Sequence, residues 1–170
     1  MVVGRRADTP GSRAHRLRLL DRLAGTERVV THLDWGIKET LVGYVTGMAD
    51  GEVATEDGAG AVGRSFRFPL VRRDGDVLSF SGRVVMTGHG GLLNVVIGDP
   101  AIEHGTDGWT LTIADPDVPD DRLVFATLEG IEESDAGLTV ASAALTEPGA
   151  DLFFGPYTRG TPLDAPTVVG

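Results

Sequence analysis

The chain has 170 residues, a length that suits one domain or one domain with a tail. It contains no cysteine, which excludes disulfides, thiolate metal sites, iron–sulfur clusters and cysteine nucleophiles. The net charge of −10 is unevenly distributed: residues 1–28 carry seven arginines against three carboxylates, and the rest carries eight basic against 22 acidic groups. A body this acidic repels phosphate backbones, so we expect no nucleic-acid partner.

Residues 1–28 form a basic N-terminal extension, followed by one domain at residues 29–170. We expect the extension to be partly disordered or to form a short amphipathic helix between Ser12 and Ala24, where apolar residues fall at helical spacing. The sequence shows no signal peptide and no transmembrane segment. As written, it therefore predicts a cytoplasmic protein, or a secreted or cell-surface one if the true start lies upstream.

The domain opens with one predicted helix. Asp34 is a suitable N-cap residue for a helix at about residues 35–45. Ile37, Leu41 and Tyr44 recur at helical spacing, which places them on one face. Tyr44 is one of only two tyrosines in the chain. Its position fits either an aromatic residue of the core or a phenol that binds a ligand.

After Gly47, a suitable helix stop, the apolar period changes from about 3.6 residues to about two. The segments with a strand-like pattern are residues 66–71, 77–86, 92–97, 109–113, 123–128 and 138–145. Turn-forming glycine and aspartate residues separate them. This pattern predicts a mainly β fold, an antiparallel β-sandwich or flattened barrel with one or two short α-helices.

Common catalytic and metal-binding motifs are absent from the sequence. It has a single lysine and no glycine-rich phosphate loop, no zinc-protease motif and no nucleophile elbow. The four histidines are too scattered for a zinc site, and the acidic clusters lack EF-hand spacing. We therefore predict a binding protein rather than an enzyme.

His89 is notable because it lies in the run Gly88-His89-Gly90-Gly91 between two apolar segments. Glycines on both sides leave its imidazole uncovered by neighbouring side chains, which suits contact with a flat ligand. A hairpin turn that happens to contain a histidine has the same pattern. The residues alone therefore leave open whether Tyr44 and His89 form a site.

Three segments, in the same order, resemble motifs of the HtaA domain, a family of haem-uptake proteins from corynebacteria and other actinobacteria. Residues 34–45 (DWGIKETLVGYV) resemble its opening motif, which has a Trp, a Lys three residues later, a Ser or Thr, and then a Tyr. Residues 80–92 (FSGRVVMTGHGGL) resemble the second motif, a strand that ends in Gly-His. The C-terminal motif resembles residues 144–146, 149–150 and 157–164 of this chain.

This resemblance implies a protein that binds ferric haem b in a mostly β fold with a short helix. It implies that Tyr44 is the axial iron ligand, that His89 hydrogen-bonds this tyrosine, and that Thr40 lines the haem. Weaker candidates for the pocket wall are Phe153, Phe154 and Tyr157. Tyrosinate is a known haem ligand type, and a hydrogen bond to the ligand oxygen would orient it.

The implied function is haem transport, transfer or storage in an actinobacterium, with haem-donor or haem-acceptor proteins as partners. The rival interpretation is a non-haem β-sandwich binding module for a protein or carbohydrate partner. An enzyme acting on haem is a third alternative. The sequence leaves open the oligomeric state, the haem donor and acceptor, and the role of the basic extension.

Overall fold

The structure is a computed structural model that describes residues 31–153 and 155–170. The basic extension at residues 1–28, with its predicted short helix, lies outside the described residues, and so does Phe154. The described part is mainly antiparallel β-sheet with two short α-helices, which confirms the predicted fold class. Within that part, no helix has the length and apolar character needed to cross a membrane.

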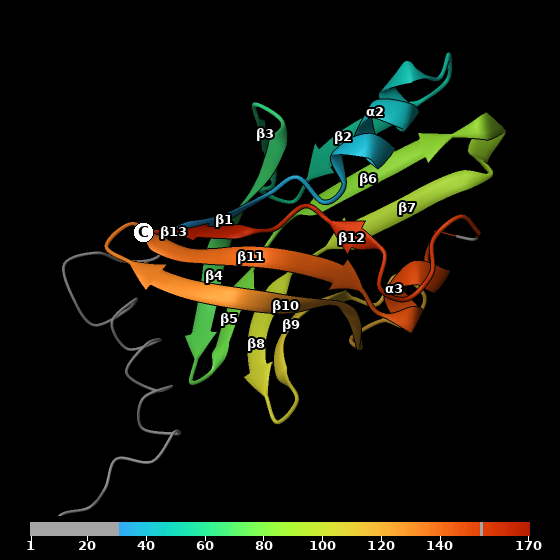
Figure 1. The fold of residues 1–170 in the computed structure, drawn as a ribbon. Helices are drawn as coiled ribbons and strands as arrows, with labels where there is room; N and C mark the ends of the chain where they lie inside the picture. The colour runs from blue at the N-terminus through green and yellow to red at the C-terminus, as the bar shows by residue number, and fades with distance from the viewer. Residues whose placement is uncertain (1–30, 154) are drawn as a thin grey trace, which may run out of the picture.

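Eight antiparallel strands of the described chain close into a barrel, because the first strand pairs with both the last strand and β4 (Figure 1). In order around the barrel, the strands are β1 (His32–Trp35), β13 (Thr167–Val169), β11 (Gly137–Leu145), β10 (Arg122–Ser134), β9 (Gly108–Ala114), β8 (Ala101–Gly105), β5 (Val77–Phe80) and β4 (Ser65–Asp74). The short strands β3 (Gly60–Val62) and β12 (Pro162–Leu163) pair with β4 and β11. Of the two predicted architectures, the flattened barrel is therefore the one observed.

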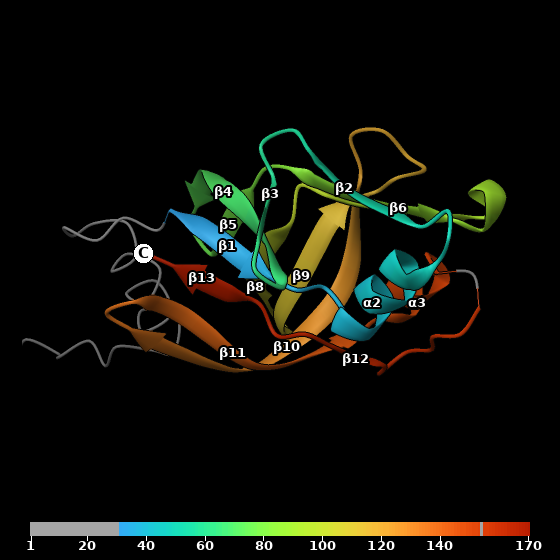
Figure 2. The ribbon, with the colours of Figure 1, turned by 90° about the horizontal axis from the view of Figure 1, so that it is seen from above.

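A separate sheet of three strands projects from the barrel, and Figure 2 shows it from above. It consists of β2 (Glu52–Glu56), β6 (Arg83–Gly88) and β7 (Leu93–Gly98). The single strand-like segment predicted at residues 77–86 is thus two strands, β5 and β6, in different sheets. The break lies at Gly82, where φ is +117° and a Cβ atom would lie 2.6 Å from the Cβ of Ala59. Only glycine fits there.

The two α-helices are α2 (Glu39–Gly47) and α3 (Glu147–Asp151), and a 3-10 turn, η1, spans His89–Gly91. The predicted helix at residues 35–45 exists and stops at Gly47, but its predicted start was wrong. Asp34 lies in β1 and is not the N-cap residue. Its carboxylate instead accepts two hydrogen bonds from the Arg67 guanidinium on β4, at 2.8 and 2.9 Å.

The predicted shared face of Ile37, Leu41 and Tyr44 was also wrong. Ile37 precedes the helix with a φ of +62°, and its side chain is fully buried. Within α2, Leu41 and Val45 face the core, whereas Tyr44 is 56% exposed. The start of the helix is displaced because Trp35, at the end of β1, and Ile37, in the irregular segment that follows, both enter the core, where burial of their apolar surface stabilises this conformation.

Candidate functional site

Tyr44 and His89, predicted as a pair, lie in contact although they are 45 residues apart. The Tyr44 Oη and the His89 Nε2 are 2.8 Å apart, within hydrogen-bond distance. Tyr44 comes from the C-terminal half of α2, and His89 comes from η1, the turn between β6 and β7. Both side chains are exposed, so the pair is open to a ligand.

The exposure of Tyr44 excludes one of its two interpretations, an aromatic residue of the core. A tyrosine of the core would be buried among apolar neighbours, but more than half of this side chain is accessible. His89 has a φ of +49°, in the left-handed region that favours glycine, as the turns of β-hairpins often require. Non-glycine residues held in such conformations are concentrated at functional sites.

The exposed face of α2 around Tyr44 carries mostly small residues. Thr40, Gly43 and Gly47 share this face with Tyr44, since they lie at helical spacing, and all four are exposed. A Cβ atom at Gly43 or Gly47 would have no other atom within 4 Å. Tyr44 therefore projects from a surface that a planar ligand could approach. Gly47 drew notice in the sequence only as a helix stop, whereas Gly43, inside the helix, was not singled out although it costs about 1 kcal/mol there.

Close packing between the end of α2 and the end of β6 fixes the separation of Tyr44 from His89. A Cβ atom at Gly88 would lie 2.8 Å from the Cε of Met48, the residue that follows α2. Figure 1 shows the β6–β7 hairpin running beside α2. A side chain at residue 88 would displace the flexible end of the Met48 side chain.

The N-terminal end of α2 is joined to the C-terminal motif. The Trp35 Nε1 donates a hydrogen bond to the carbonyl oxygen of Asp164 at 2.8 Å, and the Glu39 backbone N–H donates to the Asp164 carboxylate at 3.1 Å. The Lys38 Nζ donates to the carbonyl oxygen of Pro162 at 3.1 Å. Trp35, Lys38 and Asp164 therefore position the helix.

Phe153 and Tyr157, the weaker candidates for a pocket wall, lie in an aromatic cluster. Phe153 is buried between Phe125 and Tyr157, with ring centroids 6.0 and 5.1 Å away. Burial raises the pKa of the Tyr157 phenol, and the Lys38 Nζ lies 5.4 Å from its ring centroid. This cluster supports the N-terminal end of α2, and a role of either residue in a pocket stays a prediction. Phe154 is outside the described residues.

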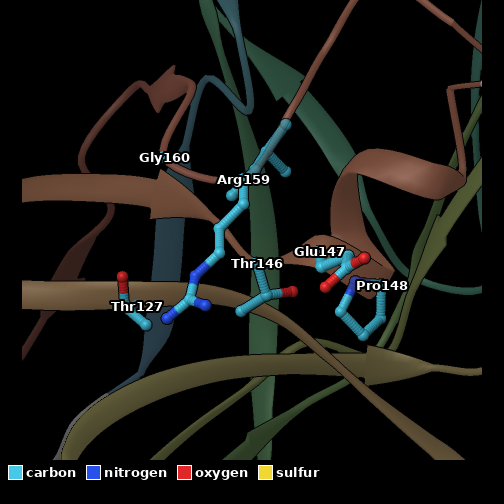
Figure 3. Close-up of a pocket in the computed structure, with 7 residues that line it drawn as sticks. Thr127, Thr146, Glu147, Pro148, Arg159 and Gly160 are labelled. Carbon is cyan, nitrogen blue, oxygen red and sulfur yellow. The ribbon is translucent and has the colours of Figure 1, made fainter.

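A second surface feature is a pocket of about 340 Å³ between β10, β11 and the start of α3 (Figure 3). Its lining residues are Thr127, Leu145, Thr146, Glu147, Pro148, Arg159 and Gly160. The Arg159 side chain extends toward Thr127 in the close-up. About half of the exposed lining is polar, whereas ligand pockets are lined predominantly by apolar and aromatic side chains. The pocket also includes neither Tyr44 nor His89.

No group of three or more His, Asp or Glu side chains in the described part of the chain could hold a metal ion. Of the four histidines, His32 lies in β1, His89 in η1 and His104 in β8, and His15 is outside the described residues. The chemistry that the site offers is therefore one exposed phenol oxygen beside one imidazole nitrogen.

Comparisons with known proteins agree on one family. The HtaA family model, described as Htaa, matches residues 30–169. Comparison with curated proteins gave no match.

Solved structures with a similar fold come from Corynebacterium glutamicum. The C-terminal domain of HtaA has a TM-score of 0.59 at 24% identity, covering 83% of this chain and 98% of that one. The heme binding protein HtaB has a TM-score of 0.68 at 19% identity, covering 82% and 91%. A domain-swapped dimer of a histidine-to-alanine variant of the HtaA domain has a TM-score of 0.51 at 24% identity, covering 77% and 91%. At these identities, the likeness shows the fold.

Proposed function

The chain belongs to the HtaA family, and from this membership we propose that it binds ferric haem b, with Tyr44 as axial ligand. His89 is the hydrogen-bond partner of the ligand oxygen, and Thr40 lines the haem one helical turn before Tyr44. The observation that carries this proposal is the 2.8 Å contact between the Tyr44 Oη and the His89 Nε2 on an exposed face. The similar fold of a heme binding protein supports it.

The residues present fit a ferric haem. A phenol is protonated at neutral pH, so the Tyr44 Oη must lose a proton to become an anionic ligand. The His89 Nε2 lies at hydrogen-bond distance and can accept that proton. The resulting N–H then donates a hydrogen bond back to the phenolate oxygen and orients it, as groups behind a metal ligand commonly do.

The same pair provides a route for release. Return of the proton from the His89 Nε2 to the Tyr44 Oη converts the phenolate to a neutral phenol, which is a weak ligand for iron. A protein that transports, transfers or stores haem needs a ligand that can be removed in this way. We propose such a role in an actinobacterium, with haem-donor or haem-acceptor proteins as partners.

We propose binding rather than catalysis as the function. Activation of molecular oxygen on haem would require ferrous iron, and an anionic tyrosine ligand would stabilise the ferric state by its charge. Reduction is therefore harder with Tyr44 bound. Conversion of haem to a linear tetrapyrrole by the pure protein with a physiological reductase would contradict this part of the proposal.

The test is a titration of the full apo-protein with hemin, followed by absorption spectroscopy. We expect saturation at about one haem per chain, with a shifted Soret band and the charge-transfer bands of tyrosinate-ligated ferric iron. Tyr44→Ala should bind hemin weakly and without those bands. Absence of saturation in the wild-type protein would contradict the proposal and favour the binding module for a protein or carbohydrate partner.

The oligomeric state belongs to the same proposal. A histidine-to-alanine variant of one structural relative forms a domain-swapped dimer. We propose that this chain can also form an oligomer, and light scattering on each hemin-titration sample measures it. A monomer at every concentration, with and without hemin, would contradict that part.

A further inference from the structure

Asp50 lies in the turn between α2 and β2, a position that the fold places next to His89. Strands β2 and β6 pair in antiparallel register with Glu52 opposite Thr87. In this register, Asp50, two residues before Glu52, lies level with His89, two residues after Thr87. The turn and the end of β6 are close, because a Cβ atom at Gly88 would lie in van der Waals contact with the Cα of Gly51, 3.7 Å away.

The Asp50 carboxylate makes one short contact with the turn at His89. The backbone N–H of Gly90 donates a hydrogen bond to the Asp50 Oδ2 at 2.7 Å. A hydrogen bond to an ionised acceptor is shorter and stronger than one between neutral groups. This hydrogen bond is the main reason that the pKa of the Asp50 carboxyl lies below its ordinary value, and the His89 backbone and side chain lower that pKa further.

The turn has a backbone conformation that needs such support. His89, Gly90 and Gly91 have φ angles of +49°, +63° and +93°. Glycine adopts these angles freely, but a histidine does so at a cost in free energy. Strained residues of this kind persist where surrounding contacts hold them. The conformation at His89 also decides where its imidazole points.

We propose that Asp50 is a positioning residue for the haem site, whose carboxylate holds the turn so that the His89 Nε2 faces the Tyr44 Oη. The inference rests on the proposed function, since it extends that site by one residue. Asp50 touches neither Tyr44 nor the ligand in this account. It acts through the backbone of Gly90.

The chain offers a matched control in Asp115, in the loop between β9 and β10. The Asp115 Oδ1 accepts hydrogen bonds from the backbone N–H groups of Asp117 and Val118, at 2.9 and 3.2 Å. Asp115→Ala thus also removes a carboxylate that holds a turn, but in a different loop. A general loss of turn stability would affect both variants alike.

The first test uses the apo-protein and needs no haem. In nitrogen-15 NMR spectra, Asp50→Ala should shift the Gly90 amide proton upfield and speed its exchange with solvent, and should shift the His89 Nε2 resonance as its contact with Tyr44 is lost. Asp50→Asn keeps a side-chain oxygen, so it should give smaller shifts and serves if Asp50→Ala does not fold. Asp115→Ala should leave both resonances unchanged. An unchanged His89 Nε2 resonance in Asp50→Ala would overturn the proposal.

The second test measures hemin affinity in a double-mutant cycle. We expect Asp50→Ala to weaken binding about 10-fold, at the lower end of the 10–100-fold range for groups behind a metal ligand. The double variant Asp50→Ala/His89→Ala should bind like His89→Ala alone, because Asp50 acts through His89. Independent, multiplying losses would overturn the proposal. Should wild-type protein bind no hemin, the proposed function fails, while the NMR test still decides whether Asp50 positions His89.

Discussion

The two ends of α2 differ in what holds them and in what they expose. At the N-terminal end, Trp35, Lys38 and Glu39 are joined by hydrogen bonds to the segment around Asp164. At the C-terminal end, an exposed Tyr44 meets a histidine in a strained turn. One continuous motif thus contains residues that position the helix and a residue available to a ligand. Similarity to the motif alone does not separate these two roles, but burial does.

The two ends of α2 also differ in how much they contribute to the stability of the fold. The N-terminal end buries Trp35 almost completely, against Phe125 at a ring-centroid distance of 5.7 Å. The C-terminal end gives up stability, with Gly43 inside the helix and a positive φ at His89. Natural proteins break local rules of stability mainly at functional sites. The comparison therefore predicts stability losses at one end and binding losses at the other.

The largest expected effect on stability is that of Trp35→Ala. Removing this buried side chain leaves a cavity and should lower the free energy of unfolding by about 3–5 kcal/mol. Chemical denaturation of the apo-protein measures it. Trp109→Ala is the control, since Trp109 is only partly buried and should cost less. A loss of unfolding free energy below about 1 kcal/mol for Trp35→Ala would contradict the conclusion that the N-terminal end of α2 stabilises the fold.

Asp164→Ala should have the next largest effect. It removes the carboxylate that accepts the Glu39 N–H, so the start of α2 loses its cap. Loss of a capping group typically costs about 1 kcal/mol. Thermal melting of the apo-protein measures this loss, and Asp164→Asn, which keeps an acceptor oxygen, should recover part of it. Equal melting temperatures for the wild-type protein and Asp164→Ala would show that the contact does not stabilise the helix.

His89→Gly should change stability by less than either variant at the other end. Glycine relieves the left-handed strain, about 1–2 kcal/mol, and loses an exposed hydrogen bond to Tyr44 of about 0.5–1.5 kcal/mol. These effects oppose each other, so the unfolding free energy should stay within about 1 kcal/mol of the wild-type value. Hemin affinity should nevertheless fall about 10–100-fold. A large drop in the unfolding free energy together with normal hemin affinity would show that His89 serves stability and not binding.

The smallest expected effect concerns pH and the ion pair at Asp34. The hydrogen bonds from Arg67 hold the pKa of the Asp34 carboxyl below its ordinary value of 3.8. A lowered pKa in the folded state means that the pair stabilises the protein fully above the ordinary value and loses this effect as the pH falls through the folded-state pKa. Asp34→Asn should therefore melt lower than wild type at pH 7, and the gap should close in acid. A gap that does not change with pH would contradict this account.

Periodicity was enough to predict the fold class, because the alternating segments and the helix near Tyr44 are local patterns. It failed where a residue's role depends on a distant partner. The start of α2 is set by Asp164, 125 residues away, and by the pairing of Asp34 with Arg67 on another strand. The short strands β1 and β13 pair with each other from opposite ends of the domain, and with β4 and β11, and such partners are not visible in a local pattern.

The candidate site likewise contains residues that the sequence predicted and one that it could not. The family resemblance implied the pair Tyr44 and His89, and the structure places their side chains in contact. Asp50 could not be found in the sequence, since a single aspartate in a turn is common and its contact with Gly90 depends on the register of β2 and β6. Phe153, a weaker candidate for the pocket wall, lies in the core, and its role in a pocket stays a prediction.

The two tyrosines of the chain allow the most direct test of the central claim, that the Tyr44 oxygen binds the iron of haem. Tyr44→Phe and Tyr157→Phe each remove one hydroxyl and keep the ring, so the apo forms of both should remain folded. We expect Tyr157→Phe to give the same hemin spectrum as the wild-type protein, and Tyr44→Phe to lose the tyrosinate charge-transfer bands. Tyrosinate bands that persist in Tyr44→Phe would contradict the account.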